Sequence, residues 1–190
     1  MEKKRIVVGA TGASGSPLLL QCLRIIKENE EYESLLIMSS SAKLTLEQET
    51  DNTVEEVEAL ADEVFLEEEI GARPASGSYR TEGMLIVPCS MKTVAGIHAG
   101  YTENLILRAA DVTIKEQRKL VLAARETPLS PIHLRNLYEL SMMPGVRIIP
   151  PMMTFYHRPE DIDAMIYHIA AKLLEPFGIE AKEYRRWNGL

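Results

Sequence analysis

The sequence predicts an α/β fold, a Rossmann-like (flavodoxin-like) three-layer sandwich with a central parallel sheet. Short, continuously apolar runs alternate with amphipathic helical patterns along the chain. Strands without polar alternation are typical of parallel sheets that helices cover on both faces. A glycine-rich turn follows the first apolar run directly and leads into a helical pattern, as in many ligand-binding α/β domains. Strands are expected at residues 5–9, 35–38, 84–87, 119–123 and 146–149.

The segments between these strands repeat apolar residues every three or four positions, which is the spacing of a helix. Thr50, Asp51 or Asn52 is expected to cap the third helix. Pro88 is expected to end the third strand, and the acidic run at 67–69 is expected to be a solvated face. Helices are expected at 14–29, 42–49, 54–61, 92–97, 104–116, 131–140 and 159–177.

Length and composition restrict the function classes. A chain of 190 residues fits one domain, here 1–190 with 178–190 as a C-terminal tail. The formal charge of 21 − 28 = −7 argues against a nucleic-acid partner. No stretch has the apolar length of a membrane span and no signal peptide precedes Ile6, so a cytoplasmic protein is expected. Cys22, Cys89 and four scattered histidines give neither a disulfide framework nor the spacing of metal ligands, so no metal is expected.

The glycine turn predicts a ligand that carries phosphate. Gly9, Gly12 and Gly15 leave bare backbone where a strand turns into a helix, and free amides at a helix N-terminus attract anions. Ser14 and Ser16 add hydroxyl donors. The turn matches neither the G-x-G-x-x-G dinucleotide pattern nor the P-loop pattern. The structural alternative is a tight turn whose glycines only allow close packing of the helix on the strand.

The end of the second predicted strand distinguishes between phosphate ligands. NAD-binding domains usually place an acidic residue there to hold the ribose hydroxyls. This chain has Ser39, Ser40 and Ser41 instead. The serines therefore favour a monophosphate or a flavin over a dinucleotide.

Further residues with distinctive chemistry are expected at the carboxyl edge of the sheet, where ligands of such folds bind. Ser90 suits a helix N-cap, whereas Cys89 has no histidine or acid at a spacing that indicates a nucleophile. Arg125 and Glu126 directly follow a predicted strand. An adjacent guanidinium and carboxylate can anchor a phosphate and move a proton.

Two groups of residues have both a functional and a structural interpretation. Arg108 and Lys115 precede the fourth strand and form either part of a basic cluster or ordinary surface charge. Tyr156 follows the last strand and Lys172 lies in the last helix, so together they can hold a second phosphate. From the residues alone, a core tyrosine and a solvated lysine are slightly favoured.

The chain resembles the UbiX-type flavin prenyltransferases, especially the branch associated with phenolic-acid decarboxylases. The resemblance covers nearly the whole length and rests on the order and spacing of many short motifs, among them GATGASG, PCSMKT and RETPL. Each motif alone is weak. They lie at 9–15, 49–50, 88–93, 108–112, 115–116, 125–129, 132–134, 150–151, 155–156 and 186–187.

The resemblance implies FMN as the bound flavin, dimethylallyl monophosphate as the prenyl donor, no metal and a homododecamer. The implied product is prenylated FMN, which a UbiD-type decarboxylase uses. Arg125 and Glu126 are implied to reach a site shared with a neighbouring subunit. The implied catalytic residues are Ser14, Glu49, Lys115 and Glu126. The implied FMN-binding residues are Gly12, Ala13, Ser14, Ser39, Ser90, Met91, Lys92, Thr93 and Arg125. The implied donor-binding residues are Lys115, Arg125, Glu126, Tyr156 and Lys172.

Two alternatives to a flavin prenyltransferase remain open. One is a flavin-dependent decarboxylase of peptidyl-cysteine or phosphopantothenoylcysteine, which the chain fits less well because 88–93 lacks an asparagine and 22–49 lacks a histidine. The other is a non-catalytic, flavin-binding subunit of an aromatic-acid decarboxylase. Lys172 also stands where arginine is expected in most relatives, which keeps the charge but loses bidentate contact with phosphate.

Overall fold

The computed structural model describes residues 3–189 and contains a six-stranded, all-parallel sheet in the order β3-β2-β1-β4-β5-β6. The chain adds strands on one side of β1 and then continues from β4 on the other side. Ligands of such sheets bind where the order reverses, at the carboxyl ends of β1 and β4. The predicted fold class is confirmed. The strands are β1 (Lys4–Ala10), β2 (Tyr32–Met38), β3 (Glu63–Leu66), β4 (Gly83–Cys89), β5 (Lys119–Ala124) and β6 (Val146–Ile148).

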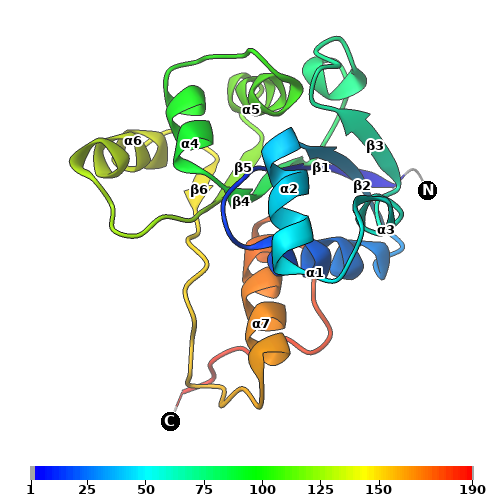
Figure 1. Cartoon of the computed structure of the whole chain (residues 1–190), viewed down its shortest axis with the longest axis vertical. Helices are drawn as coiled ribbons and strands as arrows, with labels where there is room; N and C mark the ends of the chain where they lie inside the picture. The colour runs from blue at the N-terminus through cyan, green and yellow to red at the C-terminus, as the bar shows by residue number, and fades with distance from the viewer. Residues whose placement is uncertain (1–2, 190) are drawn as a thin grey trace.

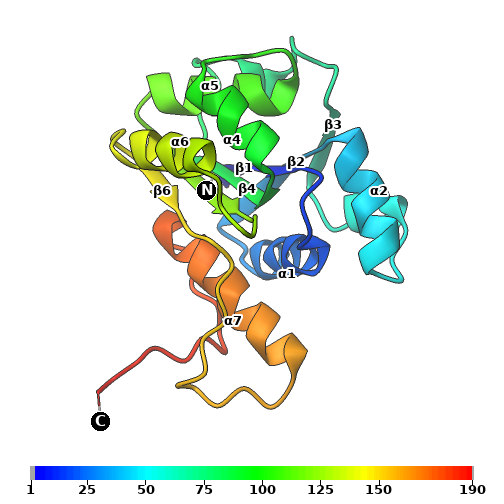
Figure 2. The ribbon, with the colours of Figure 1, turned by 60° about the vertical axis from the view of Figure 1, so that its left-hand side comes forward.

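Helices cover both faces of the sheet (Figures 1 and 2). On β1, Ile6 and Val8 pack with α1 and α7, whereas Val7 packs with α4, α5 and α6. None of the described helices is long and apolar enough to cross a membrane. The helices are α1 (Ser16–Lys27), α2 (Ser40–Glu49), α3 (Val54–Glu58), α4 (Met91–His98), α5 (Leu105–Lys115), α6 (Pro131–Ser141) and α7 (Ile162–Leu174), with 3-10 turns η1 (Arg73–Ala75) and η2 (Glu175–Phe177).

The edge strand β3 was not predicted from the sequence. It has only four residues, none of them fully buried, and its sequence EVFL leads into the acidic run. The expectation that this run is a solvated face is confirmed for Glu68 and Glu69, which are exposed, but was wrong for Glu67, which is half-buried. Glu67 accepts hydrogen bonds from Ser40 and Asn104, and Glu69 accepts one from the amide of Leu66. Glu67 therefore links the loop after β3 to the starts of α2 and α5.

Several predicted boundaries also shift. Pro88 does not end β4, which continues to Cys89 with a change of register against β5 after Ile86. The cap of α3 is Thr53, whose hydroxyl accepts from the amide of Glu56 in a capping box. The last helix is shorter than expected because Asp161 caps it at one end. At its other end the chain tightens into η2.

The segment after β6 forms an arm, which consists of the β6–α7 loop (150–161), α7 and residues 178–189. The loop and the last residues extend beyond α1, away from the sheet (Figures 1 and 2). The second half of α7 returns to the core, where Ala170 and Leu173 are buried. The β6–α7 loop and the last residues thus project from the compact α/β domain that the rest of the chain forms.

Candidate active site

Four strand ends meet at the carboxyl edge through backbone hydrogen bonds between their loops. The amide of Ser39 donates to the carbonyl of Ala10 at 3.0 Å, which links the ends of β2 and β1. The amide of Arg125 donates to the carbonyl of Cys89 at 3.1 Å, which links the ends of β5 and β4. The residues predicted to bind FMN from these loops are therefore brought to one edge of the sheet.

Two of the three glycines in the turn after β1 are required by the local structure, Gly12 by a close contact and Gly15 by its backbone conformation. A Cβ at Gly12 would lie 2.5 Å from the Cβ of Ser41, so a side chain there would collide with the first turn of α2. Gly15 has a φ of 137°, which L-residues rarely adopt. The close-packing interpretation of the glycines therefore holds, and it coexists with a site for an anion.

That anion is a carboxylate of the chain itself. Oε2 of Glu49, the last residue of α2, accepts hydrogen bonds from the amides of Gly15 at 2.9 Å and Ser16 at 2.8 Å. Burial raises the pKa of Glu49, but the hydrogen bonds from the side chain of Ser14, the two amides and the side chain of Ser16 outweigh it and hold the pKa below its ordinary value. The expectation that these amides are free for a phosphate was wrong. They bind an ionised Glu49 instead.

The N-terminus of α2 is occupied in the same way. Ser39 caps the helix through the amide of Ala42, and Glu67 accepts from both the amide and the hydroxyl of Ser40 at 2.6 Å. The N-terminus of α4 differs. Ser90 caps it through the amide of Thr93, and no carboxylate among residues 3–189 accepts a hydrogen bond from the first turn of α4. Of these three helix starts, α4 is the one open to an external anion.

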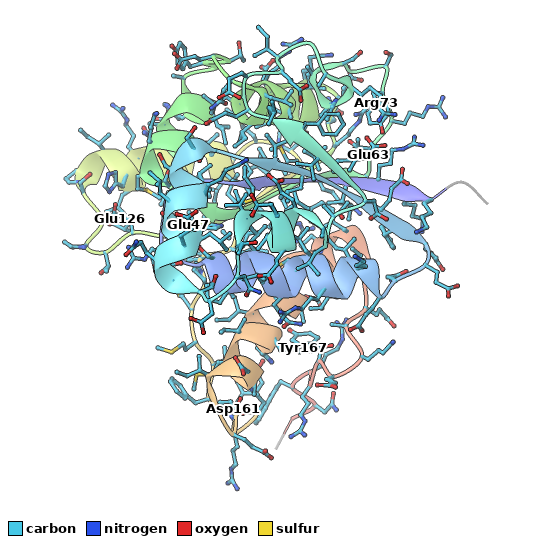
Figure 3. The ribbon with its side chains drawn as sticks, turned by 45° about the vertical axis from the view of Figure 1, so that its right-hand side comes forward. Glu47, Glu63, Arg73, Glu126, Asp161 and Tyr167 are labelled. Atoms are coloured by element: carbon cyan, nitrogen blue, oxygen red, sulfur yellow. The ribbon has the colours of Figure 1, made fainter. Side chains whose placement is uncertain are left out.

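Arg125 and Glu126 lie directly after β5, beside the start of α4. Both are exposed, and Glu126 accepts a hydrogen bond from the amide of Thr127. Figure 3 shows Glu126 on the loop that leads to α6, far from Asp161 at the outer end of the arm. Cys89 is fully buried, and burial raises the pKa of its thiol, which agrees with its poor fit to a nucleophile.

Lys115 does not join these residues within one chain. It ends α5, four positions before β5 begins, and its ammonium pairs with Glu116 beside Gly77. The six residues of β5 span about 20 Å, and Arg125 follows the other end of that strand. Lys115 and Arg125 of one chain therefore lie at opposite edges of the sheet.

Tyr156 and Lys172 belong to a separate cluster on the arm. The Tyr156 hydroxyl lies 3.4 Å from Nε2 of His168, which is buried and stacks on His157 with ring centroids 4.0 Å apart. Lys172 lies one helical turn further along and binds Glu175 at 2.5 Å, and this hydrogen bond raises the pKa of Lys172. Tyr156 is 48% exposed, so the interpretation as a core tyrosine was wrong.

Three residues of these clusters were missed in the sequence: Thr11, Glu67 and His168. Each is a polar side chain that binds a partner distant in sequence or on another element. Only Thr11 carried a local signal, because it lies inside the glycine turn. Within residues 3–189, no group of three or more histidine, cysteine or acidic side chains is arranged to hold a metal ion.

The fold and the loops at the switch point define an α/β domain of the ligand-binding type, with the open start of α4 beside the end of β5. The sequence matches the family described as Flavoprotein over residues 1–173. It is 50% identical over 186 residues to a probable UbiX-like flavin prenyltransferase from Streptomyces sp. (strain D7), covering 98% of this chain and 92% of the relative.

Two solved structures are similar over nearly the whole chain. A dodecameric FMN-dependent UbiX-like decarboxylase from Escherichia coli O157:H7 is 49% identical, with a TM-score of 0.95 over 97% of this chain and 100% of that one. AnUbiX (PadA1), solved in complex with FMN and dimethylallyl pyrophosphate, is 43% identical, with a TM-score of 0.96 over 100% of both chains. The chain belongs to the UbiX-like flavin prenyltransferases.

Proposed function

We propose that this protein transfers the dimethylallyl group of dimethylallyl monophosphate to reduced FMN, which breaks the donor's C–O bond, releases inorganic phosphate and makes prenylated FMN. Bound reduced FMN supplies the nucleophilic flavin atoms N5 and C6, which the prenyl group bridges as a fourth ring. The observation that carries the proposal is the ionised Glu49 among Ser14, Gly15 and Ser16, at the switch point where the ligand of such a fold lies. A carboxylate held there can accept a proton and return it.

The FMN phosphate is assigned to the start of α4 and to Arg125. Glu49 and Glu67 occupy the starts of α1 and α2, so a dianionic group there would meet a carboxylate. The amides of Met91 and Lys92 open α4 without such a competitor, and the exposed guanidinium of Arg125 follows the neighbouring strand. Gly12, Ala13, Ser14 and Ser39 then remain for the ring and ribityl chain.

The donor phosphate is assigned to Lys115 of one copy of the chain and to Tyr156 and Lys172 on the arm of another copy. One copy cannot supply all three to a single site beside Arg125 and Glu126, because Lys115 lies at the other edge of the sheet. We therefore propose a homo-oligomer, with the dodecamer of the Escherichia coli relative as its form. Exposed apolar side chains on the arm and on α6 support this, since such patches mark interfaces. They are Met152, Met153, Phe155, Ile162 and Trp187 on the arm, and Ile132, Leu134, Tyr138 and Met142 on or next to α6.

The wider setting is also part of the proposal. Prenylated FMN is proposed to pass to a UbiD-type decarboxylase, with this protein acting in the cytoplasm as a single domain over 1–190. The unpaired Cys22 and Cys89 support a reducing compartment. Catalysis of the cysteine-decarboxylase type has less support, because Cys89 is buried and no histidine occurs in 22–49.

One experiment tests the proposed activity. Purified protein is incubated anaerobically with reduced FMN and either dimethylallyl monophosphate or dimethylallyl pyrophosphate, and the extracted flavin is examined by mass spectrometry. We expect the flavin to gain one dimethylallyl unit with the monophosphate. Unmodified flavin with both donors, while FMN binding is confirmed by fluorescence, would leave a non-catalytic flavin-binding subunit. Release of carbon dioxide from a cysteinyl substrate would instead favour the decarboxylase alternative.

A further inference from the structure

Thr11 joins the loop after β1 to the end of β4 and to Ser90, the N-cap of α4. Its hydroxyl donates to the carbonyl of Pro88 at 3.0 Å and accepts from the amide of Ser90 at 2.9 Å. The Thr11 amide donates to the same Pro88 carbonyl at 3.1 Å. Thr11 is only 5% exposed; its hydrogen bond to Pro88 is buried, and its hydrogen bond with the Ser90 amide is partly buried.

These hydrogen bonds lie where the backbone ladder between β1 and β4 has ended. The last residue pair in register is Gly9 with Ile86. Beyond it, Pro88 lacks an amide hydrogen, and the register of β4 against β5 shifts before Cys89. Thr11 therefore replaces ladder bonds that the strands cannot make, and it fixes the spacing of the two loops beyond the sheet.

Each of the two loops holds a different part of the proposed ligand. Thr11 leads directly into Gly12–Ser14, which are assigned to the flavin ring and ribityl chain. The amide of Ser90 donates a hydrogen bond to the Thr11 hydroxyl. Ser90 also caps α4, and so it sets the direction of the amides assigned to the phosphate. Prenyl transfer depends on the position of the ring to within a fraction of an ångström, because reacting atoms must lie about 3–3.5 Å apart.

We propose that Thr11 is a positioning residue that couples the phosphate end of FMN to its ring end through the Ser90 amide. The inference rests on the proposed function, since it takes FMN as the ligand of this edge. Thr11 touches neither the flavin nor the donor in this scheme. Thr11 acts through Ser90 and α4. Without the Thr11 hydroxyl, the start of α4 would still hold the phosphate and the loop after β1 would still hold the ring, but the two would no longer be fixed relative to each other.

The test is Thr11→Val, which keeps the β-branched shape but removes the hydroxyl. The dissociation constants of FMN and of riboflavin, which lacks the phosphate, are measured by quenching of flavin fluorescence. We expect Thr11→Val to weaken FMN binding about tenfold and to change riboflavin binding less than about twofold. Thr11→Ser restores the hydroxyl and is expected to restore the preference for FMN. Turnover is expected to fall in Thr11→Val at saturating FMN and donor.

Thr113→Val is the matched control. Thr113 is equally buried, but its hydroxyl donates to Ala109 within α5, away from the site loops. A general loss of stability would lower the melting temperature of both variants without changing the ratio of riboflavin to FMN affinity. An unchanged ratio in folded Thr11→Val would overturn the inference.

A second measurement does not depend on the variant folding. Amide hydrogen exchange in the wild-type protein is expected to show a slowly exchanging Ser90 amide before FMN is added, because Thr11 already holds it. Rapid exchange at Ser90 would remove the basis of the proposal. Wild-type protein that binds neither FMN nor riboflavin would overturn the proposed function, and the inference with it. An unchanged affinity ratio in a flavin-binding protein would overturn the inference alone.

Discussion

The loops at the carboxyl edge and the arm carry the two halves of the proposed site, and they are built in opposite ways. At the carboxyl edge, polar side chains have partners from the same chain: Glu49 holds the start of α1, and Glu67 holds the start of α2. On the arm, Tyr156 is half exposed, and apolar side chains such as Phe155 and Trp187 lie at the surface.

The difference shows which half of the site one chain completes by itself. The starts of α1 and α2 are already paired with carboxylates of the same chain, and the open start of α4 lies beside Arg125, so one chain preorganises the half proposed for FMN. The arm exposes several large apolar side chains, and contiguous exposed apolar patches mark interfaces. A flavin site that one chain builds and a donor site that several chains build together would explain both observations.

Loss of the Glu49 charge is the strongest way to break the carboxyl-edge half. Glu49→Gln keeps the shape of the side chain and can still accept from one amide, but it cannot take up a proton. We expect the rate of prenyl transfer to fall by about 10²–10⁴-fold with FMN still bound, as for loss of a general base. Single-turnover formation of prenylated FMN, followed by mass spectrometry, measures this effect.

Glu47→Gln is the matched control for this change. Glu47 lies on the same helix, two positions earlier, and its side chain is exposed (Figure 3). It removes the same charge from α2 without touching the amides of Gly15 and Ser16. Equal loss of activity in both variants, or full activity in Glu49→Gln, would take Glu49 out of the proposed mechanism.

The carboxyl-edge half was largely predictable because its residues directly follow strands in the sequence. Ser39, Ser90 and Arg125 could be placed at one edge as soon as the strands were assigned. The carboxylate that binds the glycine turn was not predictable, because Glu49 lies 34 positions from Gly15 in the sequence. Thr11 was missed for a similar reason, since Pro88, its partner, lies 77 positions away.

The arm and the edge strand were predicted less well. Lys115 precedes β5, so the parallel topology alone places it at the amino edge, and only the family resemblance grouped it with Tyr156. His168 lies in a helix where a buried histidine has no sequence signature. The strand β3 was missed because it is short and partly exposed. Residues whose partners lie in another element or another chain leave no local pattern to read.

Mixed assemblies test whether the donor half is shared between chains. Lys115→Ala and Tyr156→Phe are each expected to lower turnover at limiting donor. When the two variants are co-assembled in equal amounts, random mixing restores about a quarter of the sites if Lys115 and Tyr156 come from different copies. Steady-state activity of the purified mixed oligomer measures the recovery.

The control is a mixture of Tyr156→Phe with Lys172→Ala. Both residues lie on one arm: Tyr156 contacts His168, and Lys172 lies one helical turn beyond His168 on α7. Every arm then carries one substitution, so no site is restored. Two results would contradict the division of the site between chains. One is no recovery of activity in the mixture of Lys115→Ala with Tyr156→Phe, and the other is equal recovery of activity in the control mixture.

The smallest expected effect concerns acid stability at the carboxyl edge. The pKa of Glu49 is lower in the folded chain than its ordinary value of 4.5, so its hydrogen bonds stabilise the fold above that pH. This stabilisation is lost as the pH falls through the lowered pKa, because the carboxylate must then take up a proton. Glu49→Gln lacks the titrating group, so its melting temperature should fall less between pH 6 and pH 4 than that of the wild type. Because Glu49 is only partly buried, solvent screening keeps the difference to about 2 °C.

Other acids with lowered pKa values, such as Glu116 and Glu175, are present in both proteins and cancel in this comparison. Parallel curves for the two proteins would mean that Glu49 is not held in its ionised form by the start of α1.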